Sequence, residues 1–243
     1  MLIPSFSVSM ELLNLFYLSY LVPASRVASY IPKPLAPDIF VEDRVFLSVV
    51  CFHSRNVKVA GFPFIKFSYD QINIRTYVKD PLSGKRGVLF LFSGIDSSFI
   101  SLATNILGFP WKNISFVLET AGNGVGQARE FHAKGRWNGD IDIKLTEEPA
   151  SGLSETLGDT GRYITSPSLG FYNARGSALG FRVKHTEVNS RPGKILQADF
   201  LFLISSGLLA EGEITEPDSI LLADRADFTI FLPPHRTRAG IVH

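Results

Sequence analysis

The sequence has little sulfur: Cys51 is its single cysteine, and it contains only two methionines in 243 residues. One cysteine cannot form a disulfide within the chain, and a chain without disulfides fits a reducing compartment, so we expect a cytoplasmic protein. Cys51 lies in the apolar segment FLSVVCF. In such surroundings we expect a buried structural thiol rather than a nucleophile.

The sequence also lacks an excess of charge of either sign. Its 24 basic and 23 acidic residues give a formal net charge of +1, and lysine and arginine never form a run of five. Nucleic-acid binding requires a basic stripe, and membrane surfaces attract polybasic segments. We therefore expect neither nucleic acid nor a membrane as a partner. The long apolar run at 87–111 is interrupted by Asp96 and four serines, so it reads as a strand followed by a helix.

Motifs for cofactors and metals are missing as well. The glycine-rich segment at 122–127 is followed by residues that alternate like a strand, whereas phosphate-binding glycine loops open a helix. The histidines at positions 53, 132, 235 and 243 are isolated from one another in the sequence. Since metal sites need several ligands close together, we expect no metal and no cofactor.

What the sequence has is phenylalanine, 20 residues of it, in short runs with Val, Ile, Tyr and Thr that are cut by turn residues. This texture predicts many strands. The predicted strands cover residues 7–21, 45–59, 71–79, 87–94, 114–121, 128–138, 141–149, 177–188, 195–204 and 226–234.

Two segments are predicted helices. The first begins with Pro23 in its first turn and must end before Pro32. The second is expected to begin with Asp96 as its N-cap and to end at Gly108, and residues 99, 102, 103 and 106 give it one apolar face. Many strands with few helices predict a mainly β (α+β) fold: a single domain over residues 1–243, in which a large antiparallel sheet closes into a barrel with flanking helices. Such a barrel can hold a small ligand.

One predicted strand, QINIRTYVK at 71–79, carries polar residues in alternation. The strand period places Asn73, Arg75 and Tyr77 on one face and apolar residues on the other. In one interpretation the polar face meets solvent. In the other, Arg75 points into the barrel as a fork for a carboxylate, flanked by an amide and a phenol. The sequence leaves both interpretations open.

His185 and Glu187 share a face of another predicted strand at i, i+2 spacing. They are candidates for an acid/base pair. The alternative is a surface histidine beside a carboxylate.

Lys112 is the only charged residue of the segment 105–116, and it follows a Gly-Phe-Pro-Trp turn. An ammonium in apolar surroundings has a lowered pKa and can become an amine nucleophile that condenses with a carbonyl group. The alternative is a lysine at the start of a strand, with its amine in water and its stem on Trp111.

Three segments, YIPKPLAPD at 30–38, LATNILGFPWKN at 102–113 and TIFLPPHR at 229–236, occur in an order and spacing that resembles acetoacetate decarboxylase and its wider superfamily. The resemblance spans about Leu13 to Arg236 and is closest to a branch of uncharacterised bacterial relatives. It implies a closed antiparallel β-barrel with flanking helices, and a homo-oligomer.

The resemblance also implies where the chemistry has changed. The decarboxylases form a Schiff base on a lysine that follows the Pro of this turn and is succeeded by a second lysine; here these positions hold Trp111 and Lys112. The carboxylate that the decarboxylases use on the preceding strand falls near Gln71, next to Asp70, and their arginine near the first strand has no counterpart in SMELLNLF. An indole cannot form a Schiff base, and Lys112 would face the opposite side of a strand.

We therefore expect a barrel that binds a small organic acid or carbonyl compound without lysine chemistry. Arg75 would bind the acid group, and Asn73 and Tyr77 would orient it. Trp111 would supply an aromatic wall where the decarboxylases keep their lysine, and Gln71 is a further candidate for ligand binding. One alternative is a carbon–carbon lyase, decarboxylase or aldolase-like, that acts on β-keto or 2-oxo acids through Lys112. Another is a different enzyme mechanism that uses the acid/base candidates of the strand at 177–188, and a third is a structural or assembly protein with a solid barrel.

Overall fold

The computed structural model describes residues 6–81, 83–122, 128–148 and 154–236. Its strands are β1 (Phe6–Pro23), β2 (Ala36–Pro37), β3 (Arg44–Val59), β4 (Phe62–Lys79), β5 (Arg86–Ile95), β6 (Lys112–Asn113), β7 (Ser115–Ala121), β8 (Glu130–Arg136), β9 (Asp140–Glu147), β10 (Leu169–Ala174), β11 (Ser177–His185), β12 (Arg191–Phe200) and β13 (Ser219–Arg236). Its helices are α1 (Ala24–Ala28), α2 (Ser98–Ile106), α3 (Ser154–Thr165), α4 (Leu201–Ser205) and a short 3₁₀ helix, η1 (Glu213–Thr215).

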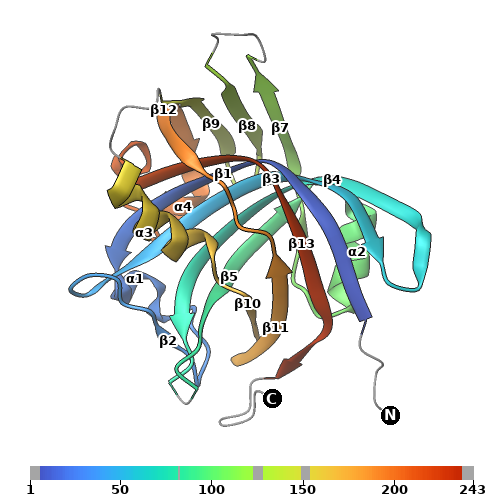
Figure 1. Cartoon of the computed structure of the whole chain (residues 1–243). Coiled ribbons are helices and arrows are strands. Elements are labelled where there is room, and N and C mark those ends of the chain that lie inside the picture. Colours follow the sequence, from blue (N-terminus) through green and yellow to red (C-terminus); the bar gives the residue numbers. More distant parts are fainter. Residues whose placement is uncertain (1–5, 82, 123–127, 149–153, 237–243) are drawn as a thin grey trace.

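The strands form a closed barrel with a second sheet folded against it (Figure 1). Within the described residues the barrel runs in the order β1-β3-β4-β5-β10-β11-β13, and β13 pairs with β1 to close it. From β13 the hydrogen bonding continues to β12 and then through β9 and β8 to β7. The mainly β fold and the closed barrel that the sequence predicts are confirmed.

One neighbouring pair of barrel strands is parallel. Gly170, Phe171 and Tyr172 of β10 lie beside Val88, Leu89 and Phe90 of β5 in parallel register, while the other barrel pairs are antiparallel. A parallel pair requires a crossover connection. Here that connection includes α2, β6 to β9 and α3, so the second sheet is largely an insertion between two adjacent strands of the barrel.

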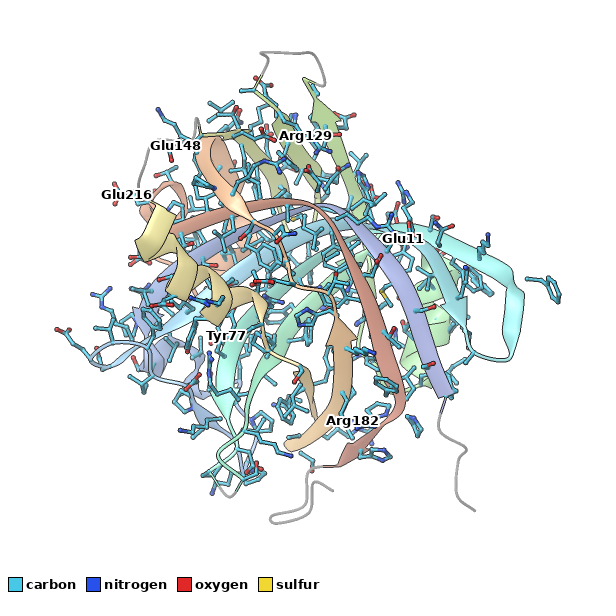
Figure 2. The ribbon with its side chains drawn as sticks, in the orientation of Figure 1. Glu11, Tyr77, Arg129, Glu148, Arg182 and Glu216 are labelled. Atoms are coloured by element: carbon cyan, nitrogen blue, oxygen red, sulfur yellow. The ribbon has the colours of Figure 1, made fainter. Side chains whose placement is uncertain are left out.

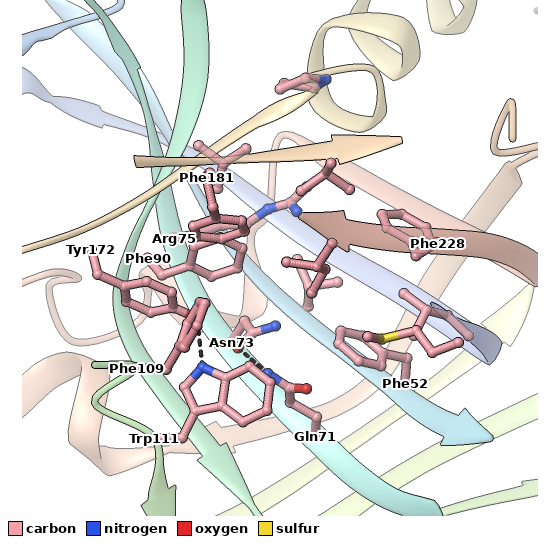
Figure 3. Close-up of a pocket in the computed structure, with 18 of the residues that line it drawn as sticks. Phe52, Gln71, Asn73, Arg75, Phe90, Phe109, Trp111, Tyr172, Phe181 and Phe228 are labelled. Atoms are coloured by element: carbon pink, nitrogen blue, oxygen red, sulfur yellow. Dashed lines mark hydrogen bonds between the residues drawn. The ribbon is translucent and has the colours of Figure 1, made fainter. Parts of the chain in front are cut away.

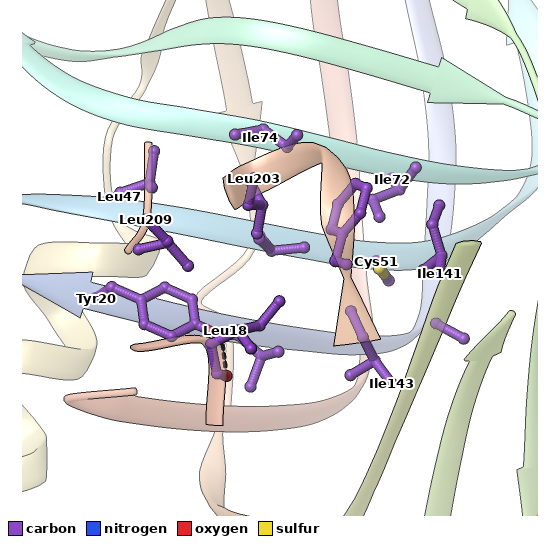
Figure 4. Packing of buried hydrophobic residues seen from close by; sticks show 14 of the residues in the cluster. Leu18, Tyr20, Leu47, Cys51, Ile72, Ile74, Ile141, Ile143, Leu203 and Leu209 are labelled. Carbon is purple, nitrogen blue, oxygen red and sulfur yellow. Dashed lines mark hydrogen bonds between the residues drawn. The ribbon is translucent and has the colours of Figure 1, made fainter. Parts of the chain in front are cut away.

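Barrel strands β1, β3 and β4 are buried on both faces over much of their length. Their outward residues pack against the second sheet and α4, and Figure 4 shows part of this cluster. Ile72 and Ile74 of β4 belong to it, together with Ile143 of β9 and Leu203 of α4. Cys51 is also in this cluster and is fully buried, and burial raises the pKa of its thiol. The sequence-based prediction of a buried structural cysteine is confirmed.

The inward residues of the same strands form a separate apolar cluster inside the barrel. Figure 2 contrasts Tyr77, which lies within the barrel, with charged residues such as Glu148 and Glu216 at the periphery. The barrel interior therefore has its own packing, independent of the layer between the sheets.

The two predicted helices are present, with one correction. α1 begins after Pro23 and ends before Pro32, as predicted. α2 is capped by Ser97, whose hydroxyl accepts a hydrogen bond from the Ile100 amide at 3.4 Å, and not by Asp96. Asp96 instead accepts a 2.9 Å hydrogen bond from the amide of Asp70, which holds its carboxylate away from the helix.

α3 and α4 are not predicted by the sequence analysis. The predicted strand at 195–204 ends at Phe200, where the chain turns into α4. A short apolar run of this kind fits either a strand or a buried helix, so its period cannot separate them. Among the described residues, no helix is long and apolar enough to cross a membrane.

Candidate functional site

The barrel encloses a cavity of about 90 Å³ (Figure 3). Its walls are the inward side chains of the barrel strands together with the turn that follows α2 and the segment before β10. Aromatic rings dominate, and the polar side chains concentrate on β4. The lining residues are Met10, Leu12, Leu15, Tyr17, Val50, Phe52, Gln71, Asn73, Arg75, Val88, Phe90, Phe109, Trp111, Pro167, Leu169, Gly170, Tyr172, Phe181, Val183, Phe228 and Ile230.

β4 directs its polar residues into the barrel. Gln71, Asn73 and Arg75 line the cavity, and Tyr77 is fully buried in the interior cluster beyond them. The side-chain amide of Gln71 donates a 2.9 Å hydrogen bond to the Asn73 side-chain oxygen. Of the two interpretations of this strand, the structure supports the one in which the polar face looks inward.

Arg75 is the only charged residue among the described residues that line the cavity. Its guanidinium donates to the carbonyl oxygen of Ile164 at 3.0 Å and to the Tyr77 hydroxyl at 3.2 Å, and it lies 5.2 Å from the ring centre of Tyr17. Its Nε is buried without a hydrogen-bond partner, and Arg75 forms no ion pair with any described residue. The half-buried guanidinium therefore has one buried donor without a partner and no counter-charge, in a largely apolar setting.

The tyrosines around Arg75 carry no compensating charge at neutral pH. Burial raises the pKa of Tyr17 to about 12, although the nearby Arg75 charge opposes the rise. Burial also raises the pKa of Tyr172 well above its usual range. Both phenols therefore stay protonated, and the electrostatic character of the cavity is set by one positive charge.

Trp111 is held firmly in the cavity wall. Its indole nitrogen donates to the Tyr172 hydroxyl at 2.6 Å, and Figure 3 shows this bond. Its main-chain oxygen accepts hydrogen bonds of 2.8 Å from both Ser101 and Asn105 of α2. The turn predicted from the Gly-Phe-Pro-Trp motif is thus fastened to the helix that precedes it.

Lys112 lies outside the cavity. It begins the short strand β6, pairs with Gly94 of β5, and its side chain is exposed. Because neighbouring residues of an extended chain point to opposite sides, the inward Trp111 turns Lys112 toward solvent. No lysine is among the described residues that line the cavity. The amine that a Schiff base would require is therefore not brought to this site.

The carboxylate next to Gln71 also points away from the cavity. One oxygen of Asp70 lies 2.5 Å from Nδ1 of His53, and the other accepts a 3.1 Å hydrogen bond from the amide of Leu118 in β7. Asp70 thus joins the barrel to the second sheet. As a result, the described lining of the cavity contains no carboxylate.

His185 and Glu187 are not part of the cavity either. His185 is the last residue of β11, stacks on Phe228 at 4.8 Å, and has its Nδ1 2.8 Å from the carbonyl oxygen of Thr186. With Arg162 and Glu187 it borders a hollow on the outer surface. An acid/base role for this pair stays a prediction, at a location separate from Arg75. In the described ranges no group of three or more His, Cys, Asp and Glu is arranged to hold a metal.

Most of the aromatic wall was not among the predicted site residues, chiefly Tyr17, Phe90, Phe109, Tyr172 and Phe181. Phe90 follows the period-two row of a predicted strand, but alternation could not say which row faces inward. On β1 the inward row changes phase at a bulge near Asn14, so that Leu15 and Tyr17 succeed Met10 and Leu12. Tyr172 belongs to β10, which the sequence analysis does not predict as a strand.

Comparison with protein families found one match. The model of the family DUF2071, described as an uncharacterized conserved protein, matches residues 9–227. A search of curated protein sequences found no match.

Solved structures of the same fold were found at low identity. The enduracididine biosynthesis enzyme MppR complexed with pyruvate aligns with a TM-score of 0.59 at 10% identity, over 97% of this chain and 91% of that chain. An acetoacetate decarboxylase-like enzyme from Sphingomonas wittichii RW1 gives 0.60 at 11% identity, over 96% and 93%. Acetoacetate decarboxylase from Legionella pneumophila gives 0.52 at 12% identity, over 95% and 87%. These similarities establish the fold that the resemblance in sequence implies.

Proposed function

Since the chain belongs to the DUF2071 family and has an acetoacetate decarboxylase-like fold, we propose that it binds an organic acid inside the barrel and does so without a Schiff-base lysine. The observation that carries this proposal is Arg75, a cation inside an aromatic cavity whose described lining holds no carboxylate. A ligand carboxylate would supply the missing counter-charge and accept a charge-assisted hydrogen bond from the unpartnered Nε.

The polar groups beside Arg75 suit a second oxygen on the ligand. The oxygen of the Asn73 side chain is already occupied by Gln71, which leaves the Asn73 amide group to donate to a carbonyl or hydroxyl oxygen. The Tyr77 hydroxyl donates to the carbonyl oxygen of Ile164 at 3.0 Å. Arg75 donates to this hydroxyl and to the same carbonyl oxygen, so the pair holds the guanidinium in position. Tyr77 would act on the ligand through Arg75.

The cavity volume limits the part of the ligand that sits next to Arg75. A cavity of about 150 Å³ holds one benzene molecule, so the cavity of about 90 Å³ next to Arg75 accommodates a head group of about four atoms. The solved MppR complex with pyruvate, a 2-oxo acid, supports a small oxygen-rich acid as the group to test first. The exposed position of Lys112 supports binding without covalent attachment.

The test is a titration of the protein with small acids, monitored by calorimetry. We expect pyruvate and acetoacetate to bind the wild-type protein and to bind Arg75→Gln about tenfold to a hundredfold more weakly, the loss typical of a charge-assisted hydrogen bond. Glutamine keeps an N–H donor near the position of the arginine Nε but removes the charge. Arg136→Gln, at an exposed position on β8, is the matched control and should bind as the wild type does.

Borohydride trapping is the second arm, because it separates binding from lysine chemistry. The wild type and Lys112→Ala should both remain unmodified after incubation with pyruvate and borohydride. A specific adduct on Lys112 would overturn the proposal in favour of a Schiff-base lyase. Equal binding of the acids by wild type and Arg75→Gln would also contradict it.

A further inference from the structure

A second cavity, of about 240 Å³, lies between the barrel and α2. Its walls come from β1, β3, β4 and β13 on the barrel side and from α2 and the following turn on the other. None of its described lining residues is charged. They are Val8, Met10, Val57, Val59, Phe67, Tyr69, Phe99, Ile100, Ala103, Thr104, Leu107, Phe109, Trp111, Ile230 and Leu232.

The few polar groups of this second cavity are neutral or already satisfied. The Thr104 hydroxyl donates to the Ile100 carbonyl of its own helix at 2.8 Å. The indole nitrogen of Trp111 is bound to Tyr172. Burial raises the pKa of Tyr69 to about 12, so its hydroxyl remains neutral. The second cavity therefore suits hydrocarbon and offers nothing to a charged group.

The two cavities follow one another along the barrel. Met10, Phe109, Trp111 and Ile230 line both of them. On β4, the inward row that contributes Phe67 and Tyr69 to the second cavity continues at two-residue spacing to Gln71, Asn73 and Arg75 in the first. Of the two adjoining cavities, the first carries the positive charge of Arg75, and the second is apolar and larger.

We propose that the ligand is a carboxylic acid with an unbranched aliphatic chain, whose head group lies at Arg75 and whose tail lies in the second cavity under α2. This inference rests on the proposed function and names its substrate class. At the volume per atom of a cavity of about 150 Å³ that holds one benzene molecule, the first cavity accommodates about four non-hydrogen atoms and the second about ten. Together they match a straight-chain acid of up to about twelve carbons.

α2 forms the cover of the tail site. It is attached to the turn at its end by the bonds from Ser101 and Asn105 to Trp111, and the Phe99 ring lies 5.9 Å from the Phe67 ring of β4. Ala103 faces the cavity, whereas Leu102 is 64% exposed and does not line it. These neighbouring positions allow the tail site to be filled, with a matched control one residue away.

The test is the binding of a series of straight-chain carboxylates from acetate to dodecanoate, below their micelle concentrations, to the full chain. We expect affinity to rise about threefold to fourfold per methylene until the second cavity is full, and then to level off. Ala103→Phe should abolish this rise and leave the affinity for butyrate unchanged, while Leu102→Phe should behave as the wild type. The milder Ala103→Leu covers the case in which the phenylalanine variant does not fold.

Decanol distinguishes failure of this inference from failure of the proposed function. It carries the tail without the charge, so it should bind more weakly than decanoate and be insensitive to Arg75→Gln. Acids that bind with Arg75 dependence but without chain-length dependence would overturn the tail site and leave the head-group site standing. Decanoate that binds the wild type and Arg75→Gln equally would overturn both.

Discussion

The indole nitrogen of Trp111 and the hydroxyl of Tyr172 are joined by a 2.6 Å hydrogen bond in the wall of the barrel cavity. Trp137 provides a natural contrast, because it is also buried but its indole nitrogen has no partner among the described residues. We predict that Trp111→Phe lowers the free energy of unfolding by about 1 kcal/mol more than Trp137→Phe, the net value of one hydrogen bond. Urea denaturation measures both.

A double-mutant cycle with Tyr172→Phe assigns this difference to the bond. The effects of Trp111→Phe and Tyr172→Phe should be non-additive by about 1 kcal/mol. Additive effects would mean that the bond contributes nothing beyond packing.

The position of Trp111 leads to a prediction about engineered chemistry. Trp111→Lys introduces an amine into the same apolar cavity that Arg75 lines, and burial together with a like charge lowers a lysine pKa. We expect this variant, unlike the wild type, to form a borohydride-trapped adduct with pyruvate. Mass spectrometry of the modified peptide is the measurement. An adduct at Lys112 instead of position 111 would contradict the assignment of the inward position.

Asp70 should be important for the attachment of the second sheet. Asp70→Ala leaves the Leu118 amide and the His53 ring without their buried acceptor, so we expect a loss of about 3–5 kcal/mol in the free energy of unfolding. Hydrogen exchange at Leu118 should accelerate. Asp140→Ala removes an exposed ion pair with Arg136 and should change stability by less than about 0.5 kcal/mol.

The ion pairs between β12 and β13 predict a dependence of stability on pH. Arg191 donates to Asp224 at 2.8 Å and holds the pKa of that carboxyl below its usual range. Because the pKa in the folded state lies below that in the unfolded state, the contribution is present above about pH 4 and is lost as the pH falls through the folded value.

Asp224→Asn should therefore be less stable than the wild type at pH 6, by no more than about 1 kcal/mol because the carboxylate is largely exposed. The two proteins should converge at the acid end of a series of thermal melts, and 1 M salt should reduce the difference at pH 6. A difference that grows toward low pH would contradict the assignment.

The mainly β fold and its closure into a barrel follow from the sequence, because many short aromatic and β-branched runs predict strands and the segments that resemble acetoacetate decarboxylase imply a barrel. The parallel pair of β5 and β10 and the inserted second sheet do not follow from it. The inward direction of Arg75 does not follow. Alternation shows which residues of β4 share a face, but Ile72 and Ile74 pack against the second sheet while Asn73 and Arg75 face the cavity, so both faces are buried. A strand buried on both sides gives no amphipathic signal that distinguishes inside from outside.

The apolar face of α2 illustrates a different limit. Helical spacing groups Phe99, Leu102, Ala103 and Ile106, yet Phe99 and Ala103 line the second cavity while Leu102 and Ile106 are 64% and 79% exposed. The helix is instead oriented by the polar residues Ser101 and Asn105, which bind the Trp111 carbonyl. Periodicity detects a helix but cannot anticipate that a hydrogen bond to a turn decides which side it presents to the barrel.

The pairing of β1 with β13 has a consequence for biosynthesis. The barrel closes only when the first described strand, which begins at Phe6, meets the last, which ends at Arg236. Contacts between residues so distant in sequence form slowly, because the intervening chain must first be ordered. The pocket around Arg75 therefore cannot form on the ribosome while β13 is still being synthesised. Until then the edges of the earlier strands are unpaired, and a chaperone or a second copy of the chain could bind them.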